Sequence, residues 1–478
     1  MARIAPSVRR SATATGARAG TVELASACQP WQPDLPGRRG SWRPAQLNHA
    51  TGHNAGYEVR TSHLKVPRSA PAGGSSAAVK VLAGQFKPPR TLLAGLSLFI
   101  ILSPFDRLSL GTVAGAQVRL ADATVLLIAP ALAVLVFRHW RSWLLDSFVQ
   151  VLVAWLAINL IGAWRSPAGA LAIAKFAGVG WLAVLALSAA ILFRDRAAQL
   201  YLRAAWCAAL AVVVAIFLAT LAMWVLGARD LSTLATFGSL PPGRYPRIRG
   251  PFMNANMACT WLLAALAVAI SSGPALGLSR NQLFTLIGLG GASSALTASP
   301  GLAGLFAGLA MSRSRLPHSL RLYALVLAIG GLAVMALATT LLVRSTPAGW
   351  RVEPAPRASV WESAAETAAS AFPLGNGLGT EPANHSWTSP AGELQLLTDA
   401  HQAYLSILAQ LGMPGLVAWL ALLAIAFLRA RHEDPWLAVG IVAAVVIPSL
   451  SGSFEDARHL WVLVGMAAGS VPANRYVM

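Results

Sequence analysis

The sequence predicts an all-α membrane protein that crosses the bilayer many times, and three observations carry this prediction. Only 12% of the 478 residues are charged, about half the fraction of a typical soluble domain, whereas 56% are hydrophobic. The mean hydropathy of the chain is +0.59. From Thr91 onward, apolar runs long enough to span a bilayer follow one another. This composition argues against a soluble enzyme and against a disordered protein.

The first 90 residues differ in composition from the rest of the chain. They carry 13 Lys and Arg against three acidic residues, are rich in Gly, Pro, Ser and Ala, and contain no long apolar run. Such a segment buries too little surface to offset its ordering entropy, and it lacks the apolar core of a signal peptide. We therefore expect residues 1–90 to be a disordered, basic cytoplasmic tail or an over-extended gene start. No aromatic-interleaved basic motif accompanies the tail, so we expect no nucleic-acid partner.

About twelve apolar segments are expected to form transmembrane helices in one domain at 91–478. They are 91–105, 120–137, 144–164, 168–193, 198–227, 251–271, 281–298, 300–312, 320–343, 402–428, 435–450 and 459–473. Basic clusters fall in alternate loops, at Arg138 and Arg141, at Arg194, Arg196 and Arg203, at Arg313, Arg315 and Arg321, and at Arg429 and Arg431. These loops are on the same side as the tail, so the positive-inside rule places both termini in the cytoplasm.

This orientation leaves two large outer loops, about 228–250 and 344–400. Loops of this length are often functional, and their arginines need another explanation because long loops escape the positive-inside rule. In the second loop we expect a short amphipathic helix over 358–371, on the outer membrane surface or capping a cavity. Its apolar face is expected to consist of Trp361, Ala364, Ala365, Ala368 and Phe372. The glycines of 373–379 indicate a turn or a close backbone approach.

A cluster of arginines stands just before the sixth apolar segment, at Arg244, Arg247 and Arg249. Guanidinium groups bind phosphate oxygens bidentately and stay charged, so this cluster suits a diphosphate. Gly250 and Pro251 at the start of the helix let the backbone come close to a ligand. The alternative is that the arginines contact lipid head groups, as arginines at membrane interfaces commonly do.

His401 stands at the start of the tenth apolar segment, at the expected membrane boundary. A neutral imidazole there can take a proton from a sugar hydroxyl, with Asp399 or Glu393 orienting the ring. The alternative is that Thr398 or Asp399 only caps the helix and that His401 is a boundary residue. His385 is a weaker candidate for the base.

The sequence also lacks the patterns of several other site types. No Asp-x-Asp pair occurs in the outer loops, so a metal bound by carboxylates is not expected. The adjacent acids Glu455 and Asp456 lie in a short loop, where Arg458 is expected to offset them. Lys175 in the fourth segment is expected to extend to the outer interface. Few central charges and no visible repeat of the two halves argue against an ion-coupled transporter.

An ordered set of motifs resembles the O-antigen ligase family. Arg247-Ile-Arg249-Gly-Pro-Phe-Met-Asn254-Ala-Asn256 looks like the family's R-x-x-G-x-F-x-N-x-N start of a central membrane helix. Leu296-Thr-Ala-Ser299-Pro-Gly301 is similar to its Thr-x-Ser-Arg-Gly turn. Arg357-x-x-x-Trp361, the glycine-rich 373–379, and His401-Gln-Ala-Tyr404-Leu resemble its large periplasmic loop and the helix after it. The architecture matches over about 91–470 and the motifs over about 245–420.

The resemblance implies an integral-membrane C-type glycosyltransferase that is metal-independent, inverting and without a cofactor. Such enzymes move a glycan from undecaprenyl diphosphate to an acceptor at the periplasmic face of the bacterial inner membrane. The acceptor is lipid A-core in a ligase, a lipid-linked repeat in a polymerase, and a protein in an oligosaccharyltransferase. Carried over by residue, Arg247, Arg249 and Arg357 would bind the diphosphate and His401 would be the base. Asn256, Asp399 and Tyr404 would support them.

Two positions depart from the family pattern. Pro300 stands where the family usually has arginine, and Gln402 replaces the usual asparagine after the histidine. These departures bear on the acceptor, because ligases and polymerases share the rest of the pattern. We slightly favour the ligase over the polymerase. A transporter or flippase of lipid-linked oligosaccharide is the alternative function, and a membrane scaffold for a polysaccharide complex is a third.

Overall fold

The structure is a computed structural model, and it describes residues 89–113, 116–228, 230–238, 245–273, 275–297, 299, 301–304, 307, 357–388 and 394–470. The predicted tail up to residue 88, the predicted span 320–343 and most of the span 300–312 lie outside the described residues. Arg244, Pro300 and Glu393 also lie outside them, as does the side chain of Arg357.

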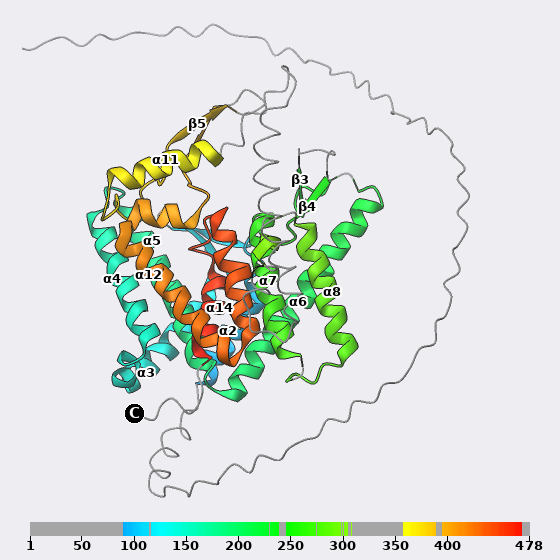
Figure 1. Ribbon diagram of the computed structural model, residues 1–478. Coiled ribbons are helices and arrows are strands. Elements are labelled where there is room, and N and C mark those ends of the chain that lie inside the picture. Colours follow the sequence, from blue (N-terminus) through cyan, green and yellow to red (C-terminus); the bar gives the residue numbers. More distant parts are fainter. Residues whose placement is uncertain are drawn as a thin grey trace, which may run out of the picture. The chain divides into compact units, whose positions relative to one another are not determined.

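The described chain is rich in α-helix (Figure 1). The helices are α2 (Arg90–Leu102), α3 (Val125–Leu144), α4 (Ser147–Arg165), α5 (Ala170–Leu192), α6 (Arg196–Val225), α7 (Ala255–Ser272), α8 (Arg280–Leu296), α11 (Arg357–Ser370), α12 (Ala403–Glu433), α13 (Pro435–Gly440) and α14 (Arg458–Gly469). Among the described residues, six helical segments are long and apolar enough to cross a membrane. The protein is therefore a multi-pass membrane protein, whereas the total of twelve spans stays a prediction.

Polar residues just before the helices fix where several of them begin. The side chain of Asp146 accepts hydrogen bonds from two amides of the first turn of α4, and Asp195 does the same for one amide of α6. Asn254 caps α7, and Ser279 forms a capping box with Gln282 at α8. Each cap satisfies amides that have no partner inside the helix, which matters most next to a bilayer.

The core is built around α7, because 83% of the residues of this apolar helix are buried inside the protein. On one side of this helix Trp261 packs against Trp206, with ring centroids 5.3 Å apart. A second group of rings joins α4, α12 and α14, where Trp419 lies 5.7 Å from Trp155 and 5.3 Å from Trp461. These five tryptophans thus hold the central helices together by large buried aromatic surfaces.

Helices α5 and α14 approach each other closely through small residues. A Cβ atom added at Gly469 would lie 2.5 Å from the carbonyl oxygen of Ala190, and one added at Gly465 would overlap the carbonyl of Ala186. Small residues four apart commonly allow such close backbone packing between membrane helices. The short predicted span 459–473 is therefore a helix, 458–469, whose small residues hold it against α5.

Three short antiparallel hairpins, which the sequence analysis did not predict, lie in the connections between helices. They pair β1 (Ser109–Val113) with β2 (Ala116–Arg119), β3 (Ala235–Gly238) with β4 (Tyr245–Ile248), and β5 (His385–Thr388) with β6 (Leu394–Leu397). Strands of four or five residues are too short to give a clear alternation in a sequence that is apolar nearly throughout. The second hairpin leads directly into the arginine segment before α7.

Helix α12 is broken near its start. Gly412 has φ +67° and ψ −164°, so the helical hydrogen bonds are interrupted there, and Pro414 follows. The glycine-rich segment 373–379 fills the break: the amides of Asn376 and Gly377 donate to the carbonyls of Ala409 and Gln410 at 2.8 and 2.9 Å. The predicted close backbone approach of 373–379 is thus confirmed.

The helix predicted over 358–371 is α11, but its buried face differs from the prediction. Val360, Ala364 and Ala368 are buried, whereas Ala365 is exposed and Phe372, beyond the end of the helix, is 64% exposed. The prediction was right for Ala364 and Ala368 but wrong for Ala365 and Phe372, because Val360 and Ala364, four residues apart, pack against Ala383 and Ala400. This contact places α11 against the segment that leads into α12 (Figure 1).

The two ends of the helices carry different polar groups. At one end, Arg194 and Arg429 both pair with Asp146, and Arg203 pairs with Asp434. These arginines belong to the basic clusters from which the topology was predicted. The arginine segment before α7 and His401 lie at the other end, because they stand at the opposite termini of the same helices. The side of the membrane that each end faces stays a prediction.

Candidate functional site

The candidate site has two parts, and the first is the arginine segment 247–256, which joins β4 to α7. Arg247 donates from Nη2 to Oδ1 of Asn256 at 3.0 Å and from Nε to the carbonyl of Thr297 at 3.3 Å. Two predicted site residues, Arg247 and Asn256, are therefore in direct contact. The bond to Thr297 also ties the segment to the end of α8, where the second family-like turn begins.

Arg249 is held by backbone carbonyls rather than by carboxylates. Its Nη1 donates to the carbonyl of Met253 at 3.2 Å, and its Nη2 donates to the carbonyl of Ser232. Its Nε is buried and has no hydrogen-bond partner among the described residues. Partial burial, and then the positive charge of Arg107, lower the pKa of Arg249 from its usual value. The guanidinium nevertheless keeps its full charge at neutral pH, since arginine stays protonated far above neutral pH.

Gly250 is required by the turn between Arg249 and α7. Its φ is +53°, and a Cβ there would lie 2.7 Å from the ring of Phe217. Only glycine adopts this conformation at so close a contact without strain. The close neighbour of Gly250 is therefore Phe217 of α6, and the approach of this backbone to a ligand stays a prediction.

The second part of the candidate site, here called the base site, consists of His401, Asp399 and Ser453. His401 Nδ1 lies 3.2 Å from Asp399 Oδ2, and the His401 amide donates to Asp399 Oδ1 at 3.1 Å. Ser453 Oγ donates to the same Oδ1 at 2.6 Å. Burial acts to raise the pKa of Asp399, but the bonds from His401 and Ser453 outweigh it and lower that pKa to about 2. Asp399 is therefore an anion throughout the neutral range.

The conformation of His401 is unusual. Its φ is +49°, the single positive φ of a non-glycine residue in the described ranges. Such conformations are costly and gather at functional sites, where the surroundings over-determine them. The side chain remains 47% exposed. An aspartate that holds Nδ1 favours the tautomer with the proton on that nitrogen, which leaves Nε2 as an acceptor for an incoming proton.

Residues 278–420 match a family model described as O-antigen ligase. The chain carries an O-antigen ligase family domain. The resemblance predicted from the ordered motifs is therefore confirmed, and the coarse activity that follows is an O-antigen ligase- or polymerase-like membrane glycosyltransferase. No curated protein matches the chain. The ligase domain as matched contains Arg357, Asp399 and His401, whereas the arginine segment 247–256 precedes it along the chain.

The segment between α13 and α14 contacts both the base site and the turn after α8. Ser453 contacts Asp399 of the base site, and the Gly452 carbonyl accepts from the amide of Ala403 at the start of α12 at 3.1 Å. A Cβ at Gly301 would lie 3.5 Å from Pro448, so the turn after α8 packs against the same segment. Sequence reasoning missed Ser453, because a serine in a short loop carries no signal of its contact with a residue 54 positions away.

The other predicted residues have more distant or undescribed positions. The Tyr404 hydroxyl donates to the carbonyl of Val446 at 2.9 Å, in the π-helical turn η2 (Ile441–Val446), so Tyr404 anchors α12 rather than joining the base site. His385 lies in β5 opposite Leu397 and is not part of the base site. The roles of Arg357 and Glu393 remain predictions, since their side chains lie outside the described residues.

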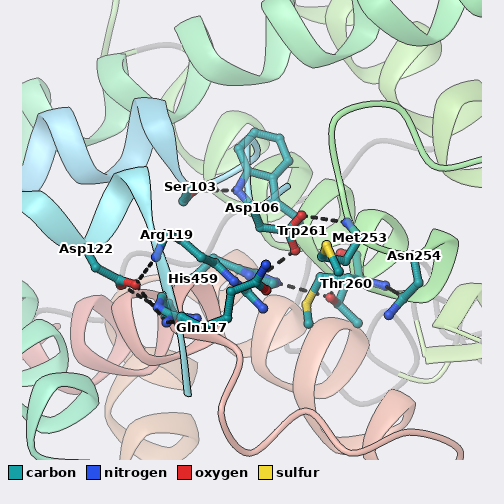
Figure 2. Close-up of polar contacts among 12 residues, drawn as sticks. Ser103, Asp106, Gln117, Arg119, Asp122, Met253, Asn254, Thr260, Trp261 and His459 are labelled. Atoms are coloured by element: carbon teal, nitrogen blue, oxygen red, sulfur yellow. Dashed lines mark hydrogen bonds and ion pairs between the residues drawn. The ribbon is translucent and has the colours of Figure 1, made fainter. Parts of the chain in front are cut away.

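A network of charged residues contacts the arginine segment through Met253 (Figure 2). Asp106, only 4% exposed, accepts from the Met253 amide at 2.6 Å and pairs with Arg119 at 3.5 Å. Burial raises the pKa of Asp106 to about 6, against the lowering effects of Arg119 and of the Met253 amide. The carboxylate of Asp106 therefore fixes the backbone whose carbonyl, at Met253, receives Arg249.

The neighbouring charges correct one expectation. Arg458 pairs with Asp122, with Nη2 and Oδ2 2.8 Å apart, and so does not offset the adjacent acids Glu455 and Asp456 as the sequence suggested. Burial, and then the charge of Asp456, raise the pKa of Glu455. Trp181 also donates to Asp122, at 3.0 Å. Asp122 lies in the short 3-10 turn η1 (Leu120–Thr124), 336 residues before Arg458, so the sequence carries no local signal of this pair.

Among the residues that the structure describes, no group of three His, Cys, Asp or Glu side chains could hold a metal ion. Metal-independent transfer therefore stays a prediction.

Proposed function

We propose that the protein transfers a glycan from undecaprenyl diphosphate to an acceptor hydroxyl at the periplasmic face of the inner membrane. The observation that carries this proposal is the base site, in which Asp399 holds the Nδ1 side of an exposed His401. A base at a membrane boundary, within a ligase-family domain, suits activation of a sugar hydroxyl. The acceptor that we favour is lipid A-core, with a lipid-linked repeat as the close second.

In the proposed reaction, Nε2 of His401 takes the proton of the acceptor hydroxyl as the oxygen attacks the anomeric carbon. The new glycosidic C–O bond forms as the C–O bond to the diphosphate breaks, on the opposite face, so the anomeric configuration inverts. The electron pair leaves with undecaprenyl diphosphate, whose negative charge Arg247, Arg249 and Arg357 would stabilise. The proton on His401 then passes to solvent.

Asp399 acts through His401 rather than on the substrate. Its charge stabilises the imidazolium that forms when the ring accepts the proton, and its two bonds fix the ring and the backbone. Ser453 holds Asp399 in turn. The half-exposed ring is what distinguishes this arrangement from a purely structural histidine, which would be buried with both nitrogens bonded.

The proposal is tested by replacing His401 in the full-length protein, purifying the variant, and measuring its transfer of glycan from a lipid-linked donor. His401→Ala is expected to lower kcat by about 10²–10⁴-fold, the usual contribution of a positioned acid or base. His385→Ala is the matched control, because this histidine belongs to the same predicted outer loop but pairs with Leu397 rather than with a residue of the base site. Equal activity of His401→Ala and the parent would rule out the assigned base.

The acceptor and the competing function need a test in cells. In a deletion strain, loss of a ligase leaves bare core and accumulates lipid-linked polymer, whereas loss of a polymerase leaves core capped with single repeats. A flippase, the alternative function, would keep its transport rate in His401→Ala. Polysaccharide gels that show no change of any glycan would contradict both transferase assignments.

A further inference from the structure

A fourth arginine, Arg107, lies beside Arg249 and was not singled out by any motif. Arg107 stands in the connection between α2 and β1, and its Nη1 donates to the carbonyl of Thr233. The Nη2 of Arg249 donates to the carbonyl of Ser232, the preceding residue. Two consecutive carbonyls of the first outer loop thus hold two guanidinium groups next to each other.

The charges of this arginine pair are at most partly offset by carboxylates, because Asp106 attracts Arg107 electrostatically without forming an ion pair with it. Neither Arg107 nor Arg249 forms an ion pair among the described residues. Asp106, the acid next to Arg107 in sequence, is occupied by the Met253 amide and by Arg119. Two like charges at close range repel each other, and an anion bound between them removes that cost.

Two further observations indicate a built site. The buried Nε of Arg249 has no partner among the described residues, and a buried donor without an acceptor is costly. Asp106 also fixes the backbone on both sides of the pair, because it adjoins Arg107 and binds the amide of Met253, whose carbonyl receives Arg249. The two guanidinium groups are therefore held by hydrogen bonds to backbone carbonyls rather than left as free side chains.

We propose that Arg107 is a further phosphate-binding residue, which together with Arg249 binds the diphosphate of the lipid donor. The inference rests on the proposed function, since it names a second element of the same donor site. Two planar guanidinium groups side by side match the several oxygens of a diphosphate better than those of a single phosphate. Arg107 lies near the N-terminal end of the domain, so the donor site draws on elements well outside the matched ligase domain.

The test is binding of prenyl phosphates to the purified full-length protein in a neutral detergent. Farnesyl diphosphate, farnesyl monophosphate and phosphatidylglycerol are the three probes, so the donor's diphosphate is distinguished from a bulk lipid head group. Arg107→Ala is expected to weaken binding of farnesyl diphosphate about tenfold or more, since hydrogen bonds to charged groups are worth at least that factor. Binding of phosphatidylglycerol should change much less.

Two variants control for structure. Arg107→Gln can still donate to the Thr233 carbonyl but has no charge, so it should bind farnesyl diphosphate as weakly as Arg107→Ala. Arg138→Ala removes an exposed arginine of α3 and should bind as the parent does. Full binding by Arg107→Gln, or an equal loss for farnesyl diphosphate and phosphatidylglycerol, would overturn the inference.

The outcome is separable from that of the proposed function. If Arg107→Ala binds farnesyl diphosphate normally while His401→Ala loses transfer, the inference fails and the transferase stands. If the arginine variants lose diphosphate binding while His401→Ala transfers glycan normally, the diphosphate site stands and the assigned chemistry fails.

Discussion

The arginines at the two ends of the helices are held in different ways. At the end with Asp146 and Asp434, each described ion pair joins an arginine to a carboxylate, as between Arg203 and Asp434 at 2.9 Å. At the end with His401, Arg119 and Arg458 also pair with carboxylates, whereas Arg107 and Arg249 donate to backbone carbonyls instead. A paired arginine serves the fold, because its charge is already compensated. A charge held by carbonyls remains available to an anion, which is the property a diphosphate site requires.

The largest effect that this comparison predicts is on stability at the end with the ion pairs. Arg203→Ala leaves Asp434, which is 8% exposed, without its arginine and is expected to lower the free energy of unfolding by about 3 kcal/mol. The thermal midpoint in detergent measures this change. The double variant Arg203→Ala with Asp434→Ala should recover much of the loss, and a single variant as stable as the parent would contradict the comparison.

A smaller effect, on activity rather than stability, is expected for Arg249. Arg249→Ala and Arg249→Lys should both reduce kcat/KM for the lipid donor, by about 10–100-fold, because lysine lacks the planar fork that binds two phosphate oxygens. Their thermal midpoints should stay near that of the parent, since no carboxylate is left unpaired. If Arg249→Lys were fully active, a point charge would suffice and the bidentate model would be wrong.

The base site allows a finer test through Ser453. Ser453→Ala removes the 2.6 Å hydrogen bond to Asp399 but leaves the two contacts that Asp399 makes with His401. We expect kcat to fall about tenfold, because a hydrogen bond to a carboxylate contributes about 1.5 kcal/mol. Ser453→Thr keeps the hydroxyl and serves as the matched control. A loss as large as that of His401→Ala would mean that Ser453 touches the substrate.

The smallest effect expected is the pH dependence of stability that Asp399 contributes. Its pKa is about 2 in the folded protein and near 3.8 ordinarily, so its stabilising contribution is present above about pH 4 and is lost as the pH falls towards 2. Because the side chain is half exposed, solvent screening limits the contribution to at most about 1 kcal/mol. Thermal midpoints of the parent and Asp399→Asn should therefore differ at pH 6 and converge on acidification.

Sequence reasoning placed much of this protein correctly where the signal was local. Apolar runs located the helices, the glycines of 373–379 indicated a close approach, and the order of motifs identified the ligase family. The face of α11 was mistaken in part because amphipathicity alone does not say which small residues meet a neighbour. The partner of Arg458 was mistaken because ion pairs join residues hundreds of positions apart.

The sequence by itself therefore determined that the chain lies in a lipid bilayer and which residue types its candidate site offers. The low charged fraction and the long apolar runs predict the bilayer, and the few arginines in the predicted outer loops stand out against the positive-inside rule. Only the tertiary structure decided which of these charges are compensated. Arg203 and Arg458 pair with carboxylates, whereas Arg107 and Arg249 donate to backbone carbonyls. His401 is positioned by Asp399, which Ser453 holds in turn. Residue type sets a group's charge, whereas its partners in three dimensions set whether that charge is free to act.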